Sequence, residues 1–259
     1  KSMRLSMIKW KLMLTTMPIA LLILAIKFGI DHVLMYEGLV KFSEIGLVIT
    51  GGIFLIGFML AGTMADYKES EKIPSEIACA IETIEDTILL GHGFKGGYDL
   101  SEMRRQLNEV TEALINWFRF NGAEEDVFRR INSITNIALT MEKAGIGAIA
   151  SRVTGEQHNL RKLFSRVNVI KKTGFLVTGY ALLEVLTVVI IALMLVSKFE
   201  NETISIIIIS FITQIFVYML RLIRDVDQPF EYSPKGTARA ADIDLFPLMD
   251  YDARAKKRL

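Results

Sequence analysis

The stretch TGGIFLIGF, residues 50–58, lies inside an uncharged run that extends from Ile45 to Ala65. Thr50, Phe54 and Phe58 are four residues apart, and on a helix this spacing keeps their side chains along one slowly drifting stripe. Glycines occupy positions 51, 52 and 57. Such a stripe can face lipid, pack against another helix or line a pore. The spacing alone leaves all three interpretations open.

The charged residues are separated from the apolar runs along the chain. Of 259 residues, 51% are hydrophobic and 23% charged, and the mean hydropathy is +0.37. Thr203–Leu220 carries no charge, and Thr173–Ser197 carries only Glu184. A spanning helix needs roughly 20 apolar residues. The sequence therefore predicts four transmembrane helices, at about 10–34, 44–66, 174–198 and 203–223.

The first of these segments has an alternative interpretation as a signal peptide. Its basic start fits one, but no small-residue cleavage site follows the apolar run. We therefore expect a retained helix, with Trp10 at the membrane interface and Lys27 snorkelling toward water.

Lys and Arg residues gather on one side of the predicted spans. They precede the first span, surround the segment between the second and third, and follow the fourth. The opposite connections hold Lys27, Lys41 and Lys198. Because cytoplasmic loops are enriched in Lys and Arg, we expect a multi-pass plasma-membrane protein whose N and C termini are cytoplasmic.

The long segment between the second and third spans is predicted to be a helical cytoplasmic region rather than a linker. Isoleucines recur at helical spacing from Ile73 to Ile88, and further helices are predicted at about 124–143 and 147–172. Pro74 should bend or end the second helix near Ile73, and a glycine-rich loop at 91–97 that contains His92 should follow. The predicted organisation is residues 1–66 with two spans, 67–172 cytoplasmic, 173–223 with two spans, and 224–259.

The last of these segments is predicted to be an extended arm, because prolines interrupt its helical periodicity. Its apolar patch should dock on a neighbouring surface, in the same chain or in another subunit. The patch consists of Ile243, Leu245, Phe246 and Leu248.

No motif in the sequence indicates catalysis, a cysteine- or histidine-rich metal site, or nucleic-acid binding. There is no phosphate-binding glycine loop and no HExxH. Cys79 is the single cysteine, and the three histidines lie far apart in sequence. The net charge of +1 gives no argument for a nucleic-acid partner. We expect a protein that is not an enzyme.

Two groups of acidic residues are candidates for ion chemistry. Glu184 lies within a predicted span, where an ionisable residue is a functional candidate by default, and Tyr180 one turn earlier is a candidate partner. A structural hydrogen bond between helices is the alternative. After the fourth span come Asp225, Asp227 and Glu231, which could hold a hard cation or instead cap the helix and pair with nearby arginines.

Three stretches together resemble the bestrophin family of ion channels in its prokaryotic branch. They are GGIFLIGFMLAGTMADYKESEKIPSEI, which begins at Gly51; DQPF, from Asp227 to Phe230; and ADIDLFPL, residues 241–248. The resemblance implies an all-α integral membrane protein that assembles as a homopentamer around one axial pore. It implies a hydrophobic neck whose rings are Thr50, Phe54 and Phe58, with glycines 51, 52 and 57 allowing close helix approach. A second, cytoplasmic constriction would fall at Ile149 or Val153.

The sequence departs from the family pattern in two places. Thr50 replaces the usual branched aliphatic residue, which makes the outer ring smaller and more polar. DVDQPFEY, from Asp225, replaces the continuous acidic run that binds calcium in animal members. Animal members of this chloride channel family pass anions, whereas known bacterial relatives look cation-selective. The resemblance therefore leaves the sign of the permeant ion open.

The sequence is therefore interpreted as a channel for small monovalent ions, with no cofactor assigned. At the inner mouth of the neck, Asp66 continues the four-residue stripe from Phe58 and would favour cations, whereas Lys68 would favour anions. The alternatives are a membrane scaffold or signalling subunit, and a transporter that uses Glu184. Partners would be further copies of the chain, the bilayer and inorganic ions.

Overall fold

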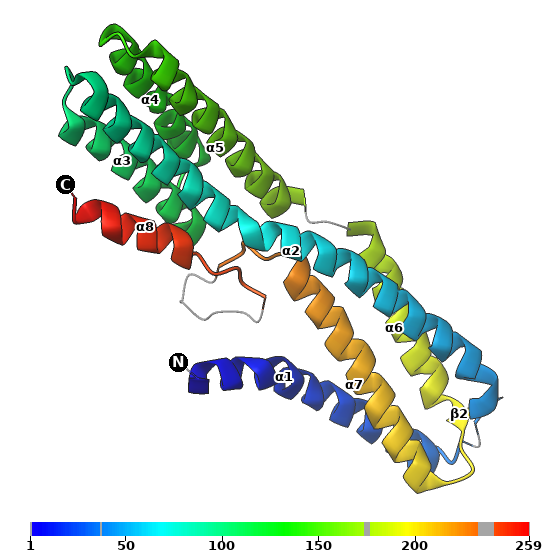
Figure 1. Cartoon of the computed structure of the whole chain (residues 1–259). Helices are drawn as coiled ribbons and strands as arrows, with labels where there is room; N and C mark the ends of the chain where they lie inside the picture. Colours follow the sequence, from blue (N-terminus) through cyan, green and yellow to red (C-terminus); the bar gives the residue numbers. More distant parts are fainter. Residues whose placement is uncertain (1, 37, 174–176, 233–240, 259) are drawn as a thin grey trace. The chain divides into compact units, whose positions relative to one another are not determined.

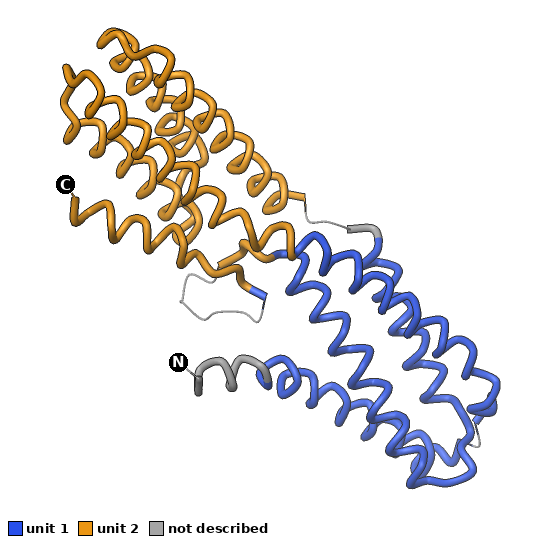
Figure 2. Tube along the Cα trace, viewed as in Figure 1, with its two compact units in different colours: residues 1–67, 174–228, 238–241 blue, residues 68–173, 229–237, 242–259 orange. Residues whose placement is uncertain are grey.

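The computed structural model describes residues 2–36, 38–173, 177–232 and 241–258 (Figure 1). The chain forms two compact units, shown in different colours in Figure 2. Unit 1 comprises residues 1–67, 174–228 and 238–241, and unit 2 comprises residues 68–173, 229–237 and 242–259. Helix α2 (Phe42–Lys95) contributes residues to both units.

Unit 1 is built from apolar helices. It contains α1 (Ser2–Phe28), which ends in the π-helical turn η1 (Gly29–Val33), the first part of α2, α6 (Val177–Leu195) and α7 (Glu202–Asp227). Three described helices are long and apolar enough to cross a membrane: Trp10–Val33, α2 and α7. Helix α6 is equally apolar but shorter over its described length, Gly179–Leu195.

The helices of unit 1 pack through a narrow apolar seam. Its core includes Ile49 and Ile56 of α2, Ile190 of α6 and Phe216 of α7. Gly52 lies in this seam, where an added Cβ would come within 2.6 Å of Ile190, so its lack of a side chain permits the close approach. Glycines 51 and 57 face open space instead. Within the chain, the expected close packing therefore holds at position 52 alone of the three.

Two very short strands join unit 1 at one end. Strand β1 (Val40–Lys41) pairs in parallel with β2 (Ser197–Lys198), with Val40 opposite Ser197 and Lys41 opposite Lys198. The Leu39 N–H extends the pairing by donating to the Val196 carbonyl at 2.9 Å. The sequence did not predict these strands, because two residues are too few to show an alternating pattern.

Unit 2 is a bundle of amphipathic helices. It contains the second part of α2, α3 (Leu100–Phe120), α4 (Glu124–Lys143), α5 (Gly147–Thr173) and α8 (Phe246–Lys256). The isoleucines of α2 at helical spacing are 3% exposed or less, and the predicted helices at 124–143 and 147–172 are confirmed. Their apolar periodicity correctly identified the buried face of each helix.

The helix does not end near Ile73, one of the two predicted outcomes at Pro74, because α2 continues through Pro74 to Lys95. Proline removes one helical hydrogen bond, at a cost of about 3 kcal/mol. Burial of several isoleucines on the same face contributes about 1.5–3 kcal/mol for each side chain, which outweighs that loss.

The predicted loop at 91–97 is shorter than expected, and His92 is helical. Helix α2 ends only where Gly96 and Gly97 adopt positive φ angles of 68° and 91°. Gly91 is glycine for a packing reason, since a Cβ there would meet the Tyr98 hydroxyl at 2.7 Å. That hydroxyl donates to the Ile88 carbonyl at 2.7 Å.

The C-terminal segment is not an extended arm throughout. Helix α7 continues to Asp227, and residues Phe246–Lys256 form α8, which begins with a proline in its first turn. Ile243, Leu245 and Leu248 are buried within the chain itself, whereas Phe246 is 58% exposed. The apolar patch therefore docks within its own subunit, apart from Phe246.

Polar contacts hold α8 to α2. The Tyr251 hydroxyl donates to Glu85 Oε2 at 3.1 Å, and Arg258 Nη2 lies 3.2 Å from the same carboxylate oxygen. Arg104 approaches the other oxygen of Glu85 at 3.3 Å. Glu85 is 2% exposed, so two cations and a phenol surround a carboxylate that water hardly reaches.

Candidate functional site

The aromatic stripe of α2 lies on the surface of unit 1. Phe54 is 72% exposed and Phe58 is 71% exposed, and Thr50 is exposed on the same face. Ile49 and Ile56 occupy the opposite, buried face. Packing of Phe54 and Phe58 against other helices of the same chain is therefore excluded. Lipid, a second copy of the chain and a pore axis remain as the environments of the stripe.

The Thr50 hydroxyl is already used within the helix. Its Oγ1 donates to the Gly46 carbonyl at 2.9 Å, one turn earlier. The side chain therefore presents no free hydroxyl proton from this rotamer, and its remaining hydrogen-bonding capacity is as an acceptor. A ring of Thr50 side chains would be less polar than the residue type alone suggests.

The two candidates for inner-mouth selectivity both lie on α2. Asp66 is partly exposed and makes a polar interaction, and Lys68 is exposed. Asp66 follows Phe58 by eight residues on an uninterrupted helix, just over two turns further along, and points about 80° away from Phe58 around the helix axis.

The candidates for the cytoplasmic constriction differ in exposure. Ile149 in the first turn of α5 is partly exposed, whereas Val153 has no exposed surface. Val153 packs among the core residues of unit 2 and is not presented to any opening. Only Ile149 can be carried forward as a constriction residue.

Glu184 lies on the exposed face of α6, among the exposed side chains Leu182, Val185 and Val188. The expected pairing with Tyr180 is wrong. The Tyr180 hydroxyl instead donates to the Ile223 carbonyl of α7 at 3.1 Å, and the Asp227 carboxylate lies beside it. The spacing of one turn predicted proximity, but Tyr180 points toward α7 whereas Glu184 points away from it.

The acidic residues at the C-terminal end of α7 and just beyond it do not form a metal cluster in the described structure. Asp227 is 3% exposed and lies beside Tyr180, and Asp225 and Glu231 each make a polar interaction. Among the described residues, no group of three or more His, Cys, Asp or Glu could hold a metal ion. Arg221, an expected partner, donates to the Thr15 carbonyl at 3.0 Å.

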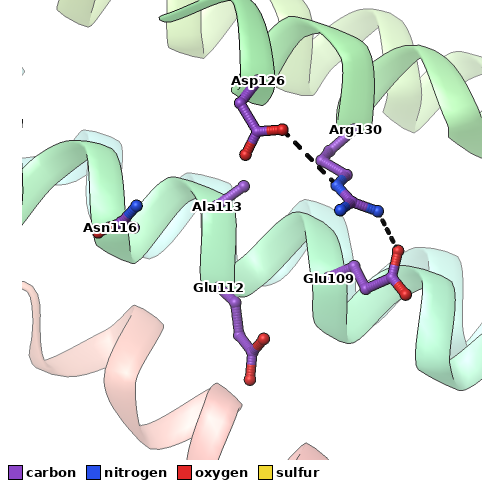
Figure 3. Close-up of a pocket in the computed structure, with 6 residues that line it drawn as sticks. All are labelled: Glu109, Glu112, Ala113, Asn116, Asp126 and Arg130. Carbon is purple, nitrogen blue, oxygen red and sulfur yellow. Dashed lines mark hydrogen bonds and ion pairs between the residues drawn. The ribbon is translucent and has the colours of Figure 1, made fainter. Parts of the chain in front are cut away.

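A cavity of about 310 Å³ in unit 2 is rich in carboxylates (Figure 3). It lies between α3 and α4 and is lined by Glu109, Glu112, Ala113, Asn116, Asp126 and Arg130. Its acids are already paired. Arg130 contacts both Glu109 and Asp126, and Lys256 lies 3.0 Å from Glu112.

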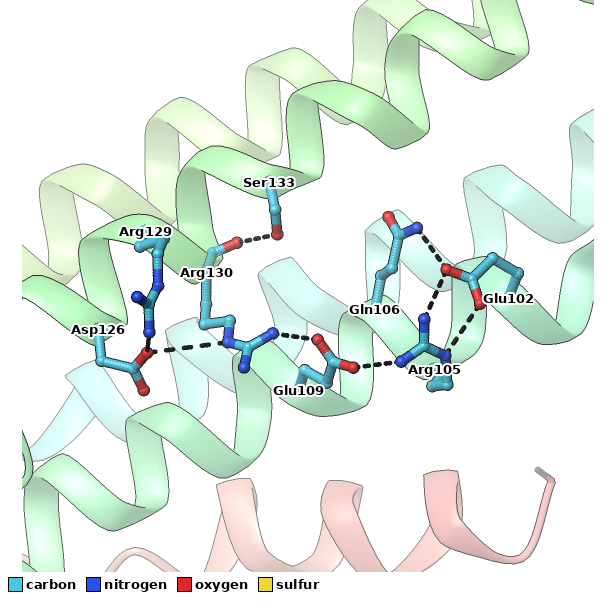
Figure 4. A network of polar contacts seen from close by, with 8 residues as sticks. All are labelled: Glu102, Arg105, Gln106, Glu109, Asp126, Arg129, Arg130 and Ser133. Atoms are coloured by element: carbon cyan, nitrogen blue, oxygen red, sulfur yellow. Dashed lines mark hydrogen bonds and ion pairs between the residues drawn. The ribbon is translucent and has the colours of Figure 1, made fainter.

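The pairing extends along the surface as a chain of alternating charges (Figure 4). Arg105 lies 2.6 Å from Glu109 and 2.8 Å from Glu102, and Arg129 contacts Asp126. Partly exposed ion pairs of this kind contribute about 0–1 kcal/mol each. The network joins α3 to α4 and leaves no carboxylate free for a bound cation, so we interpret this cavity as structural.

A buried lysine is the polar feature that the sequence interpretation missed. Lys27 does not snorkel, because it is 6% exposed. Its Nζ donates to the Leu195 and Ser197 carbonyls at 3.0 and 2.9 Å and lies 2.9 Å from Asp31. The one available signal was Asp31 four residues later, since the carbonyl partners are remote in sequence.

The described helices define the class of fold, an all-helical membrane protein with several apolar helices able to span a bilayer. No family model matches the sequence, and no curated protein matches it significantly. Solved structures do match it. A bacterial bestrophin homologue from Klebsiella pneumoniae has a TM-score of 0.73 at 13% identity, over 94% of this chain and 95% of that chain.

Two further solved structures agree with that match. A single-substitution variant of the Klebsiella homologue has a TM-score of 0.72 at 12% identity, covering 95% of this chain and 97% of its own. A membrane protein with a proline-to-alanine substitution has a TM-score of 0.74 at 13% identity, covering 94% and 96%. The chain therefore has the fold of bacterial bestrophin homologues, which confirms the resemblance seen in its sequence.

Proposed function

We propose that the chain is the subunit of a homopentameric ion channel with one axial pore for small monovalent ions. The exposed stripe of α2 carries the proposal, because Phe54 and Phe58 lie uncovered on the face opposite the buried Ile49 and Ile56. The fold shared with bacterial bestrophin homologues supports it. Five copies of the stripe would form a neck with rings at Thr50, Phe54 and Phe58.

The exposure of Glu184 is a second argument for assembly. A carboxylate at the centre of a span costs about 2.5–3.5 kcal/mol when it faces hydrocarbon. Glu184 projects from an apolar face of α6 within a single chain. In an assembly that face would meet another subunit or a water-filled space, where the charge is solvated or paired.

The proposed pore works by dewetting and by charge at its mouth. Narrow rings of aromatic side chains disfavour water and so resist ion passage until they widen. Asp66, about two turns beyond Phe58 on α2, would draw cations toward the inner mouth, and we propose a preference for cations over anions on this ground. Lys68 would oppose it. Ile149 is proposed as the second constriction.

The proposed arrangement in the membrane follows the expected topology. Four spans would cross the plasma membrane, at about 10–34, 44–66, 174–198 and 203–223. Residues 67–172, residues 224–259 and both termini would lie in the cytoplasm. Residues 174–176 of the third span lie outside the described residues. No cofactor is part of the proposal, and calcium has no role in it.

Assembly is the first test. We expect averaged images of the detergent-solubilised full-length protein, viewed along the particle axis, to show five subunits around a central opening. Reconstitution of the same sample into planar bilayers should give unitary currents. A monomer or dimer that carries no current would contradict the channel and would favour a scaffold or signalling subunit.

A further inference from the structure

The parallel strand pair places two lysines side by side. Lys41 of β1 is the register partner of Lys198 of β2, and both side chains are exposed. Paired strands lie about 4.8 Å apart, and register partners project from the same face of the pair. Like charges in this arrangement repel each other. The fold thus anchors two exposed lysine side chains on neighbouring strands at the same register position.

A cavity of about 400 Å³ opens beside this pair and is lined by both lysines. Its apolar wall includes Phe42 and Phe199, whose rings stack with centroids 5.0 Å apart, together with Ile204 and Ile208 of α7. The cavity therefore combines a cationic side with an apolar side. Ile204 is 52% exposed at the start of an apolar helix long enough to span a bilayer.

The positive charge of this cavity is not neutralised by the described residues. Glu200 is the one acidic residue in its lining, so the lining carries two positive charges and one negative charge. Among the described residues, neither lysine has a carboxylate within ion-pair distance, in contrast to Lys27 with Asp31. The Asn201 side-chain oxygen is already occupied, since it accepts from the N–H groups of Thr203 and Ile204.

We propose that this cavity binds a phosphate group through Lys41 and Lys198, and that the phosphate belongs to the headgroup of an anionic phospholipid. Two adjacent ammonium groups can each donate to separate phosphate oxygens. The acyl chains would follow the apolar surface that begins at Ile204 and Ile208. Free phosphate shares the charge chemistry, but it would leave the apolar wall without an occupant.

The test compares three probes on full-length protein in an uncharged detergent. They are dioleoyl phosphatidylglycerol, dioleoyl phosphatidylcholine and sodium phosphate, and binding is measured by native mass spectrometry and by the shift in apparent Tm. The wild-type protein should retain phosphatidylglycerol in preference to phosphatidylcholine. In the double variant Lys41→Gln/Lys198→Gln this affinity should fall by about tenfold or more, because two charged hydrogen-bond donors to the phosphate are removed.

Two control variants separate the site from general charge. Lys143→Gln/Lys257→Gln removes two exposed lysines of unit 2 and has the same net charge as the test variant, so its affinity for phosphatidylglycerol should be unchanged. Glu200→Gln removes the opposing charge from the lining and should increase that affinity. The apparent Tm without lipid verifies that each variant is folded.

The proposal is overturned if the double variant binds phosphatidylglycerol as the wild type does, or if both double variants lose affinity equally. Stabilisation by sodium phosphate equal to that by phosphatidylglycerol would overturn the assignment to a lipid. The binding readout requires no ion flux, so its failure is distinguishable from failure of the channel proposal.

Discussion

The Lys27 ammonium donates a hydrogen bond of 2.9 Å to the backbone carbonyl of Ser197, 170 residues further along the chain. Leu195 accepts a second bond from the same nitrogen, and Asp31 provides the countercharge. One buried side chain thus joins the end of α1 to the end of α6. It also satisfies carbonyl groups at a helix C-terminus, where a positive charge is favourable.

Replacement of this lysine should destabilise unit 1. In Lys27→Met the side chain retains its volume, but the Leu195 and Ser197 carbonyls lose a charged donor worth about 1.5–3 kcal/mol for each bond, and Asp31, whose side chain is 34% exposed, loses its partner. We expect a marked fall in the apparent Tm measured in detergent. Lys27→Met/Asp31→Asn should be more stable than Lys27→Met, because the stranded charge is gone. Equal stability of the two variants would show that Asp31 is not the partner that matters.

The neck predicts a specific effect of Phe54→Ala. Loss of the ring should widen the proposed neck and raise the unitary conductance measured in planar bilayers, because dewetting weakens as the diameter grows. Phe211→Ala on α7 is the matched control, since Phe211 is 67% exposed and also lies in unit 1. Equal conductance of the wild type and both variants would mean that Phe54 faces lipid.

Charge at the inner mouth should set the ion preference. In Asp66→Asn we expect the reversal potential under a salt gradient to shift away from the value for a cation-selective pore, because five carboxylates would be neutralised. Lys68→Gln should shift it in the opposite direction or leave it unchanged. An unaltered reversal potential in Asp66→Asn would remove this residue from the selectivity mechanism.

The bond between Tyr251 and Glu85 predicts a dependence on alkaline pH. Burial, and next the Glu85 carboxylate, raise the pKa of the Tyr251 phenol above its ordinary value of 10.0. The folded protein therefore holds this proton more tightly than the unfolded chain does. The resulting stabilisation is complete below about pH 10 and is lost as the pH rises beyond it.

Tyr251→Phe isolates that contribution. At neutral pH the variant should be less stable by about 1.5–3 kcal/mol, the typical worth of a hydrogen bond to a charged group. Above about pH 10 the difference from the wild type should shrink, as measured by denaturant unfolding at several pH values. A difference that stays constant up to pH 11 would contradict the raised pKa.

Periodicity predicted most of the helices, because a buried face leaves a repeating mark on the sequence. The isoleucines of α2 and the apolar positions of α4 and α5 are examples. Periodicity failed where packing overrides a local preference. Pro74 and Gly91 both have breaking tendencies, and both lie inside α2 because tertiary contacts compensate.

The candidate site was predictable only in part. The spacing of Thr50, Phe54 and Phe58 gives one face of a helix, and the structure places that face on the surface of the chain. Whether that face points toward a pore axis depends on the assembly. In a single subunit, a lipid-facing aromatic ring and a pore-facing one are equally exposed. The partners of Lys27 were beyond prediction because Leu195 and Ser197 are separated from it by 168 and 170 residues.

The pairing of β1 with β2 cannot form until both strands have been synthesised, and they lie far apart in the sequence. Val40 and Ser197 are separated by 197 − 40 = 157 residues. At roughly 5–20 residues per second, a ribosome needs about 8–31 s to deliver the second strand after the first. Throughout that interval Lys27 has been synthesised and its carbonyl partners have not. Asp31, four residues further on, already exists, so it is the partner available to Lys27 while the chain is still being made.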